Sequence, residues 1–328
     1  MENPVKINTS DAHGVAVAFL VRRGMSEEHS RMVADHLIYA MLAGHAYAGL
    51  PRLIPMAERL RKTGTGGTIR TVKETDNSAL IDGANVNGYV TSVIAMKKAM
   101  ALAKASGVGI VGVNNSWFSG LLRYYVEPAA NEGFIAIHAA NSTARVAPHG
   151  GADSLLGTNP IAFAFPGERS PLVIDFATSQ LMWGDVIYHG QLGKPLPSDC
   201  AVDPQGRRTT DPAAALAGAI LGWGGARGYS VSLVVQALGI LAGSDPIIGE
   251  AGKWGYLFIT INPELLMPVD EFKQRIGVLR SSIESSRPIE GGGPVRVPGS
   301  ATDARLAEGR ARGWIEIEEE IYRRLTVE

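Results

Sequence analysis

Residues 157–179 read Gly-Thr-Asn-Pro-Ile-Ala-Phe-Ala-Phe-Pro-Gly-Glu-Arg-Ser-Pro-Leu-Val-Ile-Asp-Phe-Ala-Thr-Ser. Two apolar runs in this stretch, at 161–165 and 172–174, are typical of buried strands. A turn rich in hydroxyl and amide groups, 157–160, precedes the first run, and a similar turn with one carboxylate, 175–179, follows the second. Such a cluster at strand ends suits a ligand that bears phosphate or carboxylate, although ordinary turn chemistry explains either turn taken alone.

Helical and strand patterns alternate on both sides of this stretch. The first sixty residues predict three helices, over 11–23, from Ser26 as N-cap through Ile38, and from Pro51 to about residue 61. Further strands are expected at 68–72, 79–81, 108–113, 134–139 and 256–261, further helices at 90–105, 121–131, 212–220, 229–242, 269–285, 301–310 and 318–325, and a long loop at 190–212. This alternation predicts an α/β fold without a regular β-α-β register.

The composition is that of a folded protein with no strong net charge. Of the 328 residues, 45% are hydrophobic and 19% are charged, which favours a packed core over disorder. Thirty-one Lys and Arg against 32 Asp and Glu give a formal net charge of −1, so no net basic field attracts nucleic acid or anionic lipid. The single cysteine, Cys200, excludes an internal disulfide and a cysteine-cluster metal site. We expect no signal peptide, no membrane-spanning segment and a cytoplasmic location.

One segment matches a dinucleotide fingerprint in letters but not in context. Residues 107–112 read Gly-Val-Gly-Ile-Val-Gly, yet these glycines follow a predicted helix and lie inside a predicted strand. The fingerprint requires them after a strand and at the start of a helix, where their amides face a pyrophosphate. The sequence therefore favours close backbone packing here over a Rossmann site. The seven histidines are scattered without metal-ligand spacing, so no metal is predicted.

Several motifs, taken together and in this order, resemble one family: the malate/L-lactate dehydrogenase type 2 family, also called L-sulfolactate dehydrogenase-like. The most specific pair is Gly-Thr-Asn-Pro at 157–160 with Asp-Phe-Ala-Thr-Ser at 175–179. The other matching segments, which extend the resemblance over nearly the whole chain, are 44–53, 114–127, 146–165, 202–206 with Thr209 and Pro212, 224–228 and 297–299. Within the family, the chain looks most similar to the Δ1-piperideine-2-carboxylate/Δ1-pyrroline-2-carboxylate reductase branch.

The resemblance implies an α/β, L-sulfolactate dehydrogenase-like fold with a non-Rossmann nicotinamide-cofactor domain. It implies an N-terminal helical region over 1–65 that contributes to the substrate site, and an α/β core for cofactor binding and dimerisation over 66–285. Residues 286–328 are expected to form a C-terminal segment that packs back on the core. It also implies a homodimer that moves hydride between NADPH, or NADH, and the α-carbon of a 2-oxo acid or a cyclic 2-imino acid.

The resemblance also assigns roles to individual residues. Arg52 matches the family's substrate-carboxylate position, where five donors in a rigid fork suit bidentate binding, and Thr158 and Trp117 are expected beside the substrate. Arg227 stands where the family has lysine and keeps the charge for a phosphate. The expected cofactor contacts are Trp117, Phe118, Ser119, Gly120, Leu121, Asp175, Phe176, Ala177, Trp183, Gly184, Arg227, Pro298 and Gly299.

Two family histidines are replaced in this chain. The family's Ser-His-Gly, whose histidine donates a proton, reads Tyr47-Ala48-Gly49 here, so Ala48 stands at the donor position. The family's Ser-Asn-His-Phe reads Asn-Ser-Trp-Phe at 115–118. Asp185 is retained where the imine-reducing branch carries an aspartate that relays charge with its serine and histidine. The expected catalytic residues are therefore Asp185, Tyr47 and Arg52.

Three interpretations of these replacements stay open. In the first, an active reductase uses Tyr47 as the acid, since a phenol with a reference pKa of about 10 stays protonated at neutral pH. In the second, the substrate is an already protonated iminium, which accepts hydride without a protein acid and lies against Tyr47 and Trp117. In the third, the chain is an inactive or sensor paralogue that binds the dinucleotide without turnover. Tyr47 and Trp117 also suit plain packing.

Overall fold

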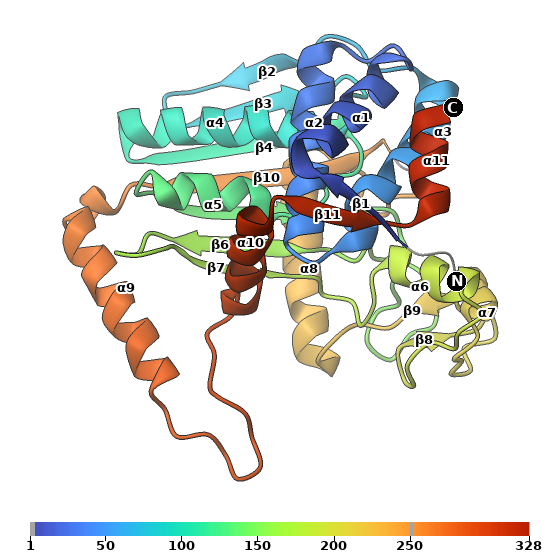
Figure 1. The fold of residues 1–328 in the computed structure, drawn as a ribbon. Helices are drawn as coiled ribbons and strands as arrows, with labels where there is room; N and C mark the ends of the chain where they lie inside the picture. Colours follow the sequence, from blue (N-terminus) through green and yellow to red (C-terminus); the bar gives the residue numbers. More distant parts are fainter. Residues whose placement is uncertain (1–3, 250–251, 328) are drawn as a thin grey trace.

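A seven-stranded mixed sheet forms the centre of the computed structural model, which describes residues 4–249 and 252–327 (Figure 1). In spatial order the strands are β2 (Arg70–Glu74), β3 (Ser78–Asp82), β4 (Val108–Ser116), β10 (Trp254–Ile261), β5 (Ile135–Ala140), β6 (Ile161–Phe165) and β7 (Leu172–Phe176). β3 and β4 run parallel, and the other neighbours in this sheet are antiparallel. The predicted α/β class is confirmed, and the sheet is mixed.

Helices cover both faces of this sheet. α4 (Gly88–Ser106) and α5 (Arg123–Asn131) pack on one face, and α8 (Gly225–Leu241) packs on the other. A Cβ on Gly109 would lie 2.0 Å from the carbonyl oxygen of Ala99 in α4, whereas one on Gly112 would lie 3.2 Å from Cα of Ala242, just after α8. The Gly-x-Gly-x-x-Gly segment therefore lets both helix layers approach β4 closely, as its sequence context indicated.

The N-terminal helices build a second core beside the sheet. They are α1 (Thr9–Val21), α2 (Glu27–Leu42) and α3 (Leu53–Thr63), and they bury Phe19, Leu37 and Met56 between them. Ser26 Oγ accepts a hydrogen bond from the His29 N–H at 3.3 Å, which confirms the predicted N-cap. Two 3₁₀ turns, η1 (Ala46–Ala48) and η2 (Leu50–Arg52), separate α2 from α3, so Pro51 lies one turn before the helix that it was predicted to start.

The C-terminal segment returns to two parts of the molecule. α9 (Val269–Glu284) lies at the β6–β7 edge of the sheet and leads through a long loop to α10 (Ser300–Arg312), β11 (Trp314–Ile317) and α11 (Glu319–Val327). β11 pairs antiparallel with β1 (Val5–Asn8), and α11 contacts α1. The sequence did not predict β1 or β11, because each short strand is completed only by its distant partner.

A smaller lobe follows β7, at the lower right of Figure 1. It contains α6 (Trp183–Gln191), α7 (Pro212–Ala217) and the pair β8 (Ala201–Val202) and β9 (Ala219–Ile220). Val186, Leu196 and Ile220 form part of its own small core. The predicted loop at 190–212 therefore includes β8, and α6 was not predicted. This lobe places the first turn of α6 beside η1.

Within the described part of the chain, no helix combines the length and the apolar character needed to cross a bilayer. The same residues contain no group of three His, Cys, Asp or Glu side chains arranged as metal ligands. Cys200 is buried, and its thiol donates a hydrogen bond to the carbonyl oxygen of Pro197 at 2.7 Å.

Candidate active site

Arg52, at the end of η2, holds its guanidinium between two aromatic rings. Its Cζ lies 4.4 Å from the ring centre of Phe118 and 5.9 Å from that of Tyr47. A cation over an aromatic face is attracted by the ring quadrupole, and a hydrogen bond to the Tyr89 side chain adds a further contact. No carboxylate in residues 4–249 or 252–327 pairs with Arg52. Its charge is thus positioned but not neutralised within the described chain.

Tyr47 packs against the first turn of α6. A Cβ on Gly184 would lie 2.1 Å from Cε1 of Tyr47, so this contact requires glycine. The rings of Tyr47 and Tyr188 also approach, with centres 6.3 Å apart. The contact brings together two predicted site segments, the turn at 44–52 and the residues Trp183–Asp185.

Asp185, next to Gly184, has a defined structural role at the start of α6. Its Oδ2 accepts a hydrogen bond from the Met182 N–H at 3.1 Å, which satisfies a free donor at the helix start. Its Oδ1 has no hydrogen-bond partner among the described residues. Burial and the charge of Arg305 lower the pKa of nearby His45, and the charge of Asp185 partly opposes them. Asp185 therefore caps the helix with one oxygen and keeps the other available.

The loop between β4 and α5 carries the expected cofactor contacts Trp117–Leu121. Phe118 has φ +54° and Gly120 has φ +69°, so both adopt the left-handed conformation. That conformation is unfavourable for phenylalanine and marks loops whose shape is imposed by their surroundings. A Cβ on Gly120 would lie 2.3 Å from Nε2 of His36, so the loop also passes close to α2.

Hydrogen bonds fasten this loop from two helices. The Leu121 N–H donates to Nε2 of His36 at 2.9 Å, and the Tyr125 hydroxyl donates to the carbonyl oxygen of Ser119 at 2.6 Å. His36 lies among aromatic rings, with its ring centre 4.6 Å from Tyr89. Burial lowers the pKa of His36 to about 3, so the ring is neutral at physiological pH and can accept the loop N–H.

Asp175 supports the same loop from the end of β7. Its carboxylate accepts the Arg123 N–H at 2.8 Å and also the Leu122 N–H, both at the start of α5. A carboxylate at a helix N-terminus is stabilised by the free N–H groups and the helix dipole. Burial raises the pKa of Asp175 to about 6, although the two N–H groups and the Arg123 charge partly oppose this shift. The Asp175 carboxylate therefore orders the start of α5.

Trp117 differs from its predicted role. Its side chain has 0% exposure, and its indole N–H donates to the carbonyl oxygen of Asn85 at 2.8 Å. The ring fills the core between α3 and α4, so it has no exposed face to offer a substrate or a cofactor. We therefore correct its predicted ligand contact to a packing role behind the loop. Phe118, whose ring centre lies 5.7 Å from that of Trp254, provides partly exposed aromatic surface instead.

The two strand-end turns interlock below this loop. Thr178 donates its hydroxyl to the carbonyl oxygens of Thr158 and Asn159, each at 3.1 Å, and its N–H to Thr158 at 3.0 Å. The Asn159 side-chain amide donates to Ser232 and, at 2.9 Å, to Gln236 on α8. Thr158 is only 8% exposed, so its carbonyl serves this interlock and little of the residue faces a substrate.

The start of α8 presents exposed backbone groups. Phe176 stacks on Trp223, with ring centres 5.7 Å apart, just before the helix. Gly224 and Gly225 have φ +63° and +59°, and no side chain caps the first turn. Arg227 is exposed on that turn. Free N–H groups at a helix start together with an arginine form a suitable anion site.

The remaining predicted contacts lie at packed positions. The Trp183 ring is covered by Arg145, whose Cζ lies 4.3 Å from the ring centre. Gly299 has φ +85°, and a Cβ there would lie 2.2 Å from the carbonyl oxygen of Val173. Gly299 therefore allows the start of α10 to approach β7, with Pro298 exposed beside it.

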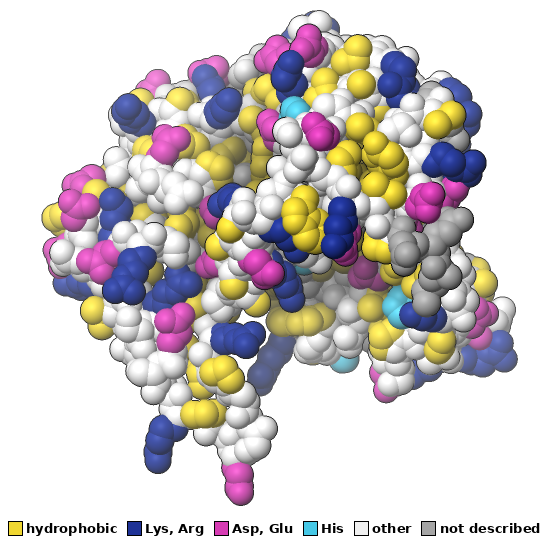
Figure 2. Space-filling view, in the orientation of Figure 1, with side chains coloured by type: hydrophobic (Ala, Val, Ile, Leu, Met, Phe, Trp, Pro, Cys, Tyr) yellow, Lys and Arg dark blue, Asp and Glu magenta, His cyan; other side chains and the backbone are white. Residues whose placement is uncertain are grey.

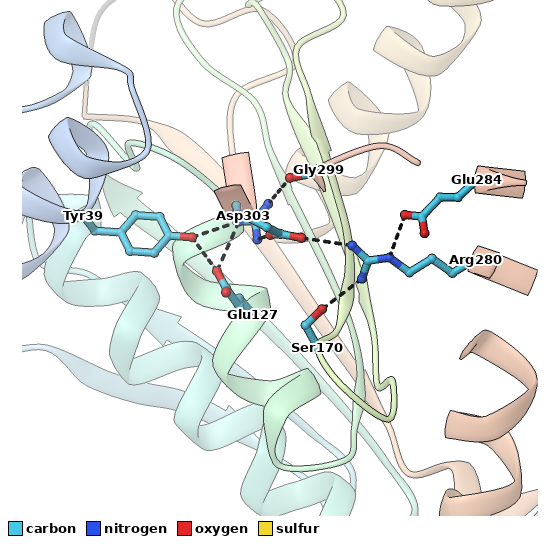
Figure 3. Close-up of polar contacts among 8 residues, drawn as sticks. Tyr39, Glu127, Ser170, Arg280, Glu284, Gly299 and Asp303 are labelled. Atoms are coloured by element: carbon cyan, nitrogen blue, oxygen red, sulfur yellow. Dashed lines mark hydrogen bonds and ion pairs between the residues drawn. The ribbon is translucent and has the colours of Figure 1, made fainter. Parts of the chain in front are cut away.

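A buried arginine joins the site to the C-terminal segment (Figure 3). Arg123 donates from Nε to the Tyr39 hydroxyl at 2.9 Å and to Glu127 at 3.2 Å, and it pairs with Asp303 on α10. Asp303 also pairs with Arg280 of α9 at 3.4 Å. Burial and the Glu127 charge raise the pKa of the Tyr39 phenol. This network connects α2, α5, α9 and α10 through Arg123, and the backbone N–H of the same residue donates to Asp175.

Comparison with known proteins identifies the family of this chain. A family model described as malate/L-lactate dehydrogenase matches residues 7–326. This chain belongs to the malate/L-lactate dehydrogenase family. It is 35% identical over 317 residues to the L-sulfolactate dehydrogenase of Methanocaldococcus jannaschii, which covers 93% of this chain and 91% of that protein. The oxidoreductase class predicted from the sequence is confirmed at this level.

Reductases of the branch suggested by the sequence are found among the relatives. The chain is 31% identical to the Delta(1)-pyrroline-2-carboxylate reductase 2 of Burkholderia multivorans, over 81% of this chain and 82% of that protein. The crystal structure of delta1-piperideine-2-carboxylate reductase from Pseudomonas syringae aligns with a TM-score of 0.88 and 27% identity, covering 100% of this chain and 99% of that one. The predicted L-sulfolactate dehydrogenase-like fold is confirmed.

Sequence reasoning missed several residues of this family member's site. These residues are His36, Tyr125 and Arg145, which support the predicted segments. His36 contacts Leu121 and Arg145 contacts Trp183, and both partners are distant in sequence. Tyr125 contacts Ser119, which is only six residues away. His36 lies on an otherwise ordinary helix, so no local pattern distinguishes it. The short spacing of Ser119 and Tyr125 at the start of a helix is the one signal that the sequence offered.

Proposed function

We propose that this protein reduces a cyclic 2-imino acid, or alternatively a 2-oxo acid, with NADPH as reductant and NADH as a second possibility. The observation that carries the proposal is the uncompensated guanidinium of Arg52 between Tyr47 and Phe118. A planar fork of donors is suited to a carboxylate. The relatives named above act on sulfolactate and on pyrroline-2-carboxylate, and the names of both substrates denote carboxylates.

The described residues fit a dinucleotide at the start of α8. Free backbone N–H groups at Gly224 and Gly225, with Arg227 beside them, suit phosphate groups, and the exposed Trp223 stacked on Phe176 offers a flat surface to a base or a nicotinamide. A bound reduced nicotinamide would supply the hydride for the reaction. Ser119–Leu121, Asp175, Ala177 and Gly299 are assigned here to shaping the adjacent loop and strand ends.

The protein must also manage a proton and a positive charge. Tyr47 is our candidate donor, because its ring centre lies 5.9 Å from Cζ of Arg52 and a phenol hydroxyl can donate a proton. The available Oδ1 of Asp185 is suited to stabilising a protonated nitrogen near the start of α6. For a substrate that is already an iminium, Tyr47 instead provides an aromatic face, and no acid is required.

We further infer that the protein works as a homodimer. Apolar side chains on α8 and just after it are exposed, with Val234 at 53%, Leu241 at 70% and Ile247 at 54%. Burial of such side chains against a second copy is favourable by about 25 cal/mol per Å². Sedimentation should therefore give twice the mass of one chain, and a monomer at working concentration would overturn this inference.

Titration of the protein with NADPH and NADH, followed by tryptophan fluorescence, tests the function. Saturable quenching is expected because Trp223 and Trp254 lie beside Phe176 and Phe118. Oxidation of the cofactor should then be followed with Δ1-piperideine-2-carboxylate, Δ1-pyrroline-2-carboxylate and a series of 2-oxo acids. Saturable binding without any turnover would support a dinucleotide sensor over a reductase. Absence of binding up to millimolar cofactor would remove both.

A further inference from the structure

A groove of about 700 Å³ opens between α2, α4, α5 and α10, apart from the residues assigned to substrate and cofactor. Figure 2 shows apolar side chains in the recess between the parts of the surface that α4 and α2 form. On α4 the lining residues are Val93, Met96, Lys97, Met100, Ala101 and Lys104, and side chains of α2 and α5 with Phe134 and Arg310 complete the lining.

The spacing of the lining residues on α4 shows that one face of this helix turns to the groove. On α4 the lining residues follow the three- and four-residue steps that mark one helical face. The apolar floor includes Met96, Met100 and Phe134. Flexible methionines beside aromatic rings adapt to apolar ligands of different shape. The groove therefore has both the size and the lining of a small-molecule site.

Cations predominate among the uncommitted charges at the rim. Lys97, Lys104 and Arg310 are exposed, and none has an ion pair or hydrogen bond within the described chain. Two of the acidic lining residues are already engaged, Asp35 with His13 at 3.0 Å and Glu127 with Arg123 at 3.2 Å. Glu132 is the one acidic lining residue without such a partner in residues 4–249 and 252–327. An apolar floor below three free cations is complementary to a ligand with an apolar body and an anionic head.

We propose that this groove binds an amphipathic organic anion, and that occupancy alters the affinity of the loop at Phe118–Leu121 for the dinucleotide. Tyr124 and Tyr125 line the groove and contact His36, with ring centres 4.5 Å and 5.3 Å from it. His36 accepts the Leu121 N–H, and Tyr125 donates to Ser119. A ligand on these two tyrosines thus touches the residues that hold the loop. The effect on dinucleotide affinity rests on the proposed function, whereas binding of the anion does not.

Fluorescence titration with 8-anilinonaphthalene-1-sulfonate, an aromatic sulfonate, tests the binding site. We expect saturable binding that NADPH does not displace and that decanoate does displace. The double variant Lys97→Glu/Lys104→Glu should weaken binding tenfold or more, because both free cations on α4 are reversed. Met100→Trp, which fills the floor, should weaken it by a similar factor. The control Lys62→Glu/Lys194→Glu changes the net charge equally at exposed positions away from the groove and should leave binding unchanged.

Several outcomes would overturn the binding site. Displacement of the probe by NADPH, with both groove variants silent, would place the probe in the dinucleotide site. A change of oligomeric state in Lys97→Glu/Lys104→Glu would show that a second copy covers the groove. Equal weakening in the charge-matched control would show that only net charge matters.

The coupling has its own measurement. Saturating decanoate should shift the dissociation constant of NADPH about fivefold or more, within the usual range for coupled sites. Tyr125→Phe removes the hydroxyl that donates to Ser119 and should reduce this shift while the anilinonaphthalene sulfonate still binds. An unchanged NADPH affinity with the groove occupied would overturn the coupling. Failure of NADPH to bind at all would overturn the proposed function and leave the anion site standing.

Discussion

The strand-end turns and the turn between α2 and α3 belong to one candidate site but are held in different ways. At the strand ends, buried Thr178 and Asn159 donate to carbonyl and side-chain acceptors on neighbouring segments. At the turn, half-buried Tyr47 and Arg52 are held mainly by contacts with rings and with Gly184. Directional hydrogen bonds in a buried region fix one geometry, whereas aromatic contacts at a partly exposed turn accept more variation.

The position at which the resemblance predicts a replaced proton donor lies in the second kind of region. The strand ends carry Gly-Thr-Asn-Pro and Asp-Phe-Ala-Thr-Ser, which the resemblance matches to the family, while the turn carries Tyr47-Ala48-Gly49 where the resemblance leads us to expect Ser-His-Gly. A substitution in the turn disrupts few hydrogen bonds, because its side chains are held mainly by ring contacts. The comparison therefore predicts that the strand ends maintain the site's architecture and that the turn adjusts its chemistry.

The largest expected effect is that of Tyr47→Phe. If Tyr47 donates the proton, kcat should fall about 10²–10⁴-fold with KM little changed, since only the hydroxyl is removed. Steady-state kinetics measure this, with Tyr188→Phe as the matched control on the neighbouring ring. A nearly silent Tyr47→Phe, with a rate that falls as pH rises through the substrate's own pKa, would instead support the preformed iminium.

Arg52→Ala should have the next largest effect. Loss of the charged partner of a substrate carboxylate costs on the order of 2–5 kcal/mol, or about 30-fold to several thousandfold in kcat/KM, mainly through KM. Arg52→Lys should restore only part, because lysine lacks the planar fork. Arg61→Ala is the control, because Arg61 is exposed in the last turn of α3, the helix that follows Arg52. An equal loss of NADPH affinity in Arg52→Ala would assign the residue to the cofactor instead.

The same contrast explains how far the sequence could predict this molecule. The strands predicted at 161–165 and 172–174 are encoded locally, and the structure places both there, with the second extended to Phe176. Trp117 was predicted from its place in a family motif, but the core between α3 and α4 buries it. His36 was missed because its partner Leu121 is far along the chain. Residues whose function depends on one tertiary contact leave no local pattern.

Acid should destabilise the protein through its buried histidines. Burial lowers the pKa values of His36 and His138 to about 3, against 6.5 for an exposed imidazole. Between pH 6.5 and 3 the unfolded chain therefore binds more protons, so the free energy of unfolding falls as pH falls. By linkage the fall is about 3 kcal/mol per histidine on reaching pH 4.5. Asp175, whose folded pKa is raised to about 6, acts in the opposite direction below pH 6.

Urea unfolding at pH 7 and pH 4.5 measures this dependence. His36→Gln should remove the contribution of one of the two buried imidazoles to the difference between the two pH values, and His138 should retain the other. His149→Gln is the control, because that histidine is exposed. A pH dependence in His36→Gln equal to that of the unmodified protein would contradict this prediction. It would show that a neutral His36 does not stabilise the loop at Trp117–Leu121 through the Leu121 N–H.

The smallest expected effect is the loss of one buried hydroxyl in Thr178→Val. Valine keeps the shape but removes the donor to the Thr158 and Asn159 carbonyls, so the free energy of unfolding should fall by about 1–3 kcal/mol with an unchanged urea m-value. Thr71→Val, on the exposed strand β2, should change it by about 0.5 kcal/mol or less. If the two variants are equally stable, the interlock does not hold the strand ends. Thr178→Val can also be less stable and yet have an unchanged KM. In that case the strand ends and the turn are energetically separate, because weakening the hydrogen bonds of Thr178 leaves Arg52 in position to bind the substrate.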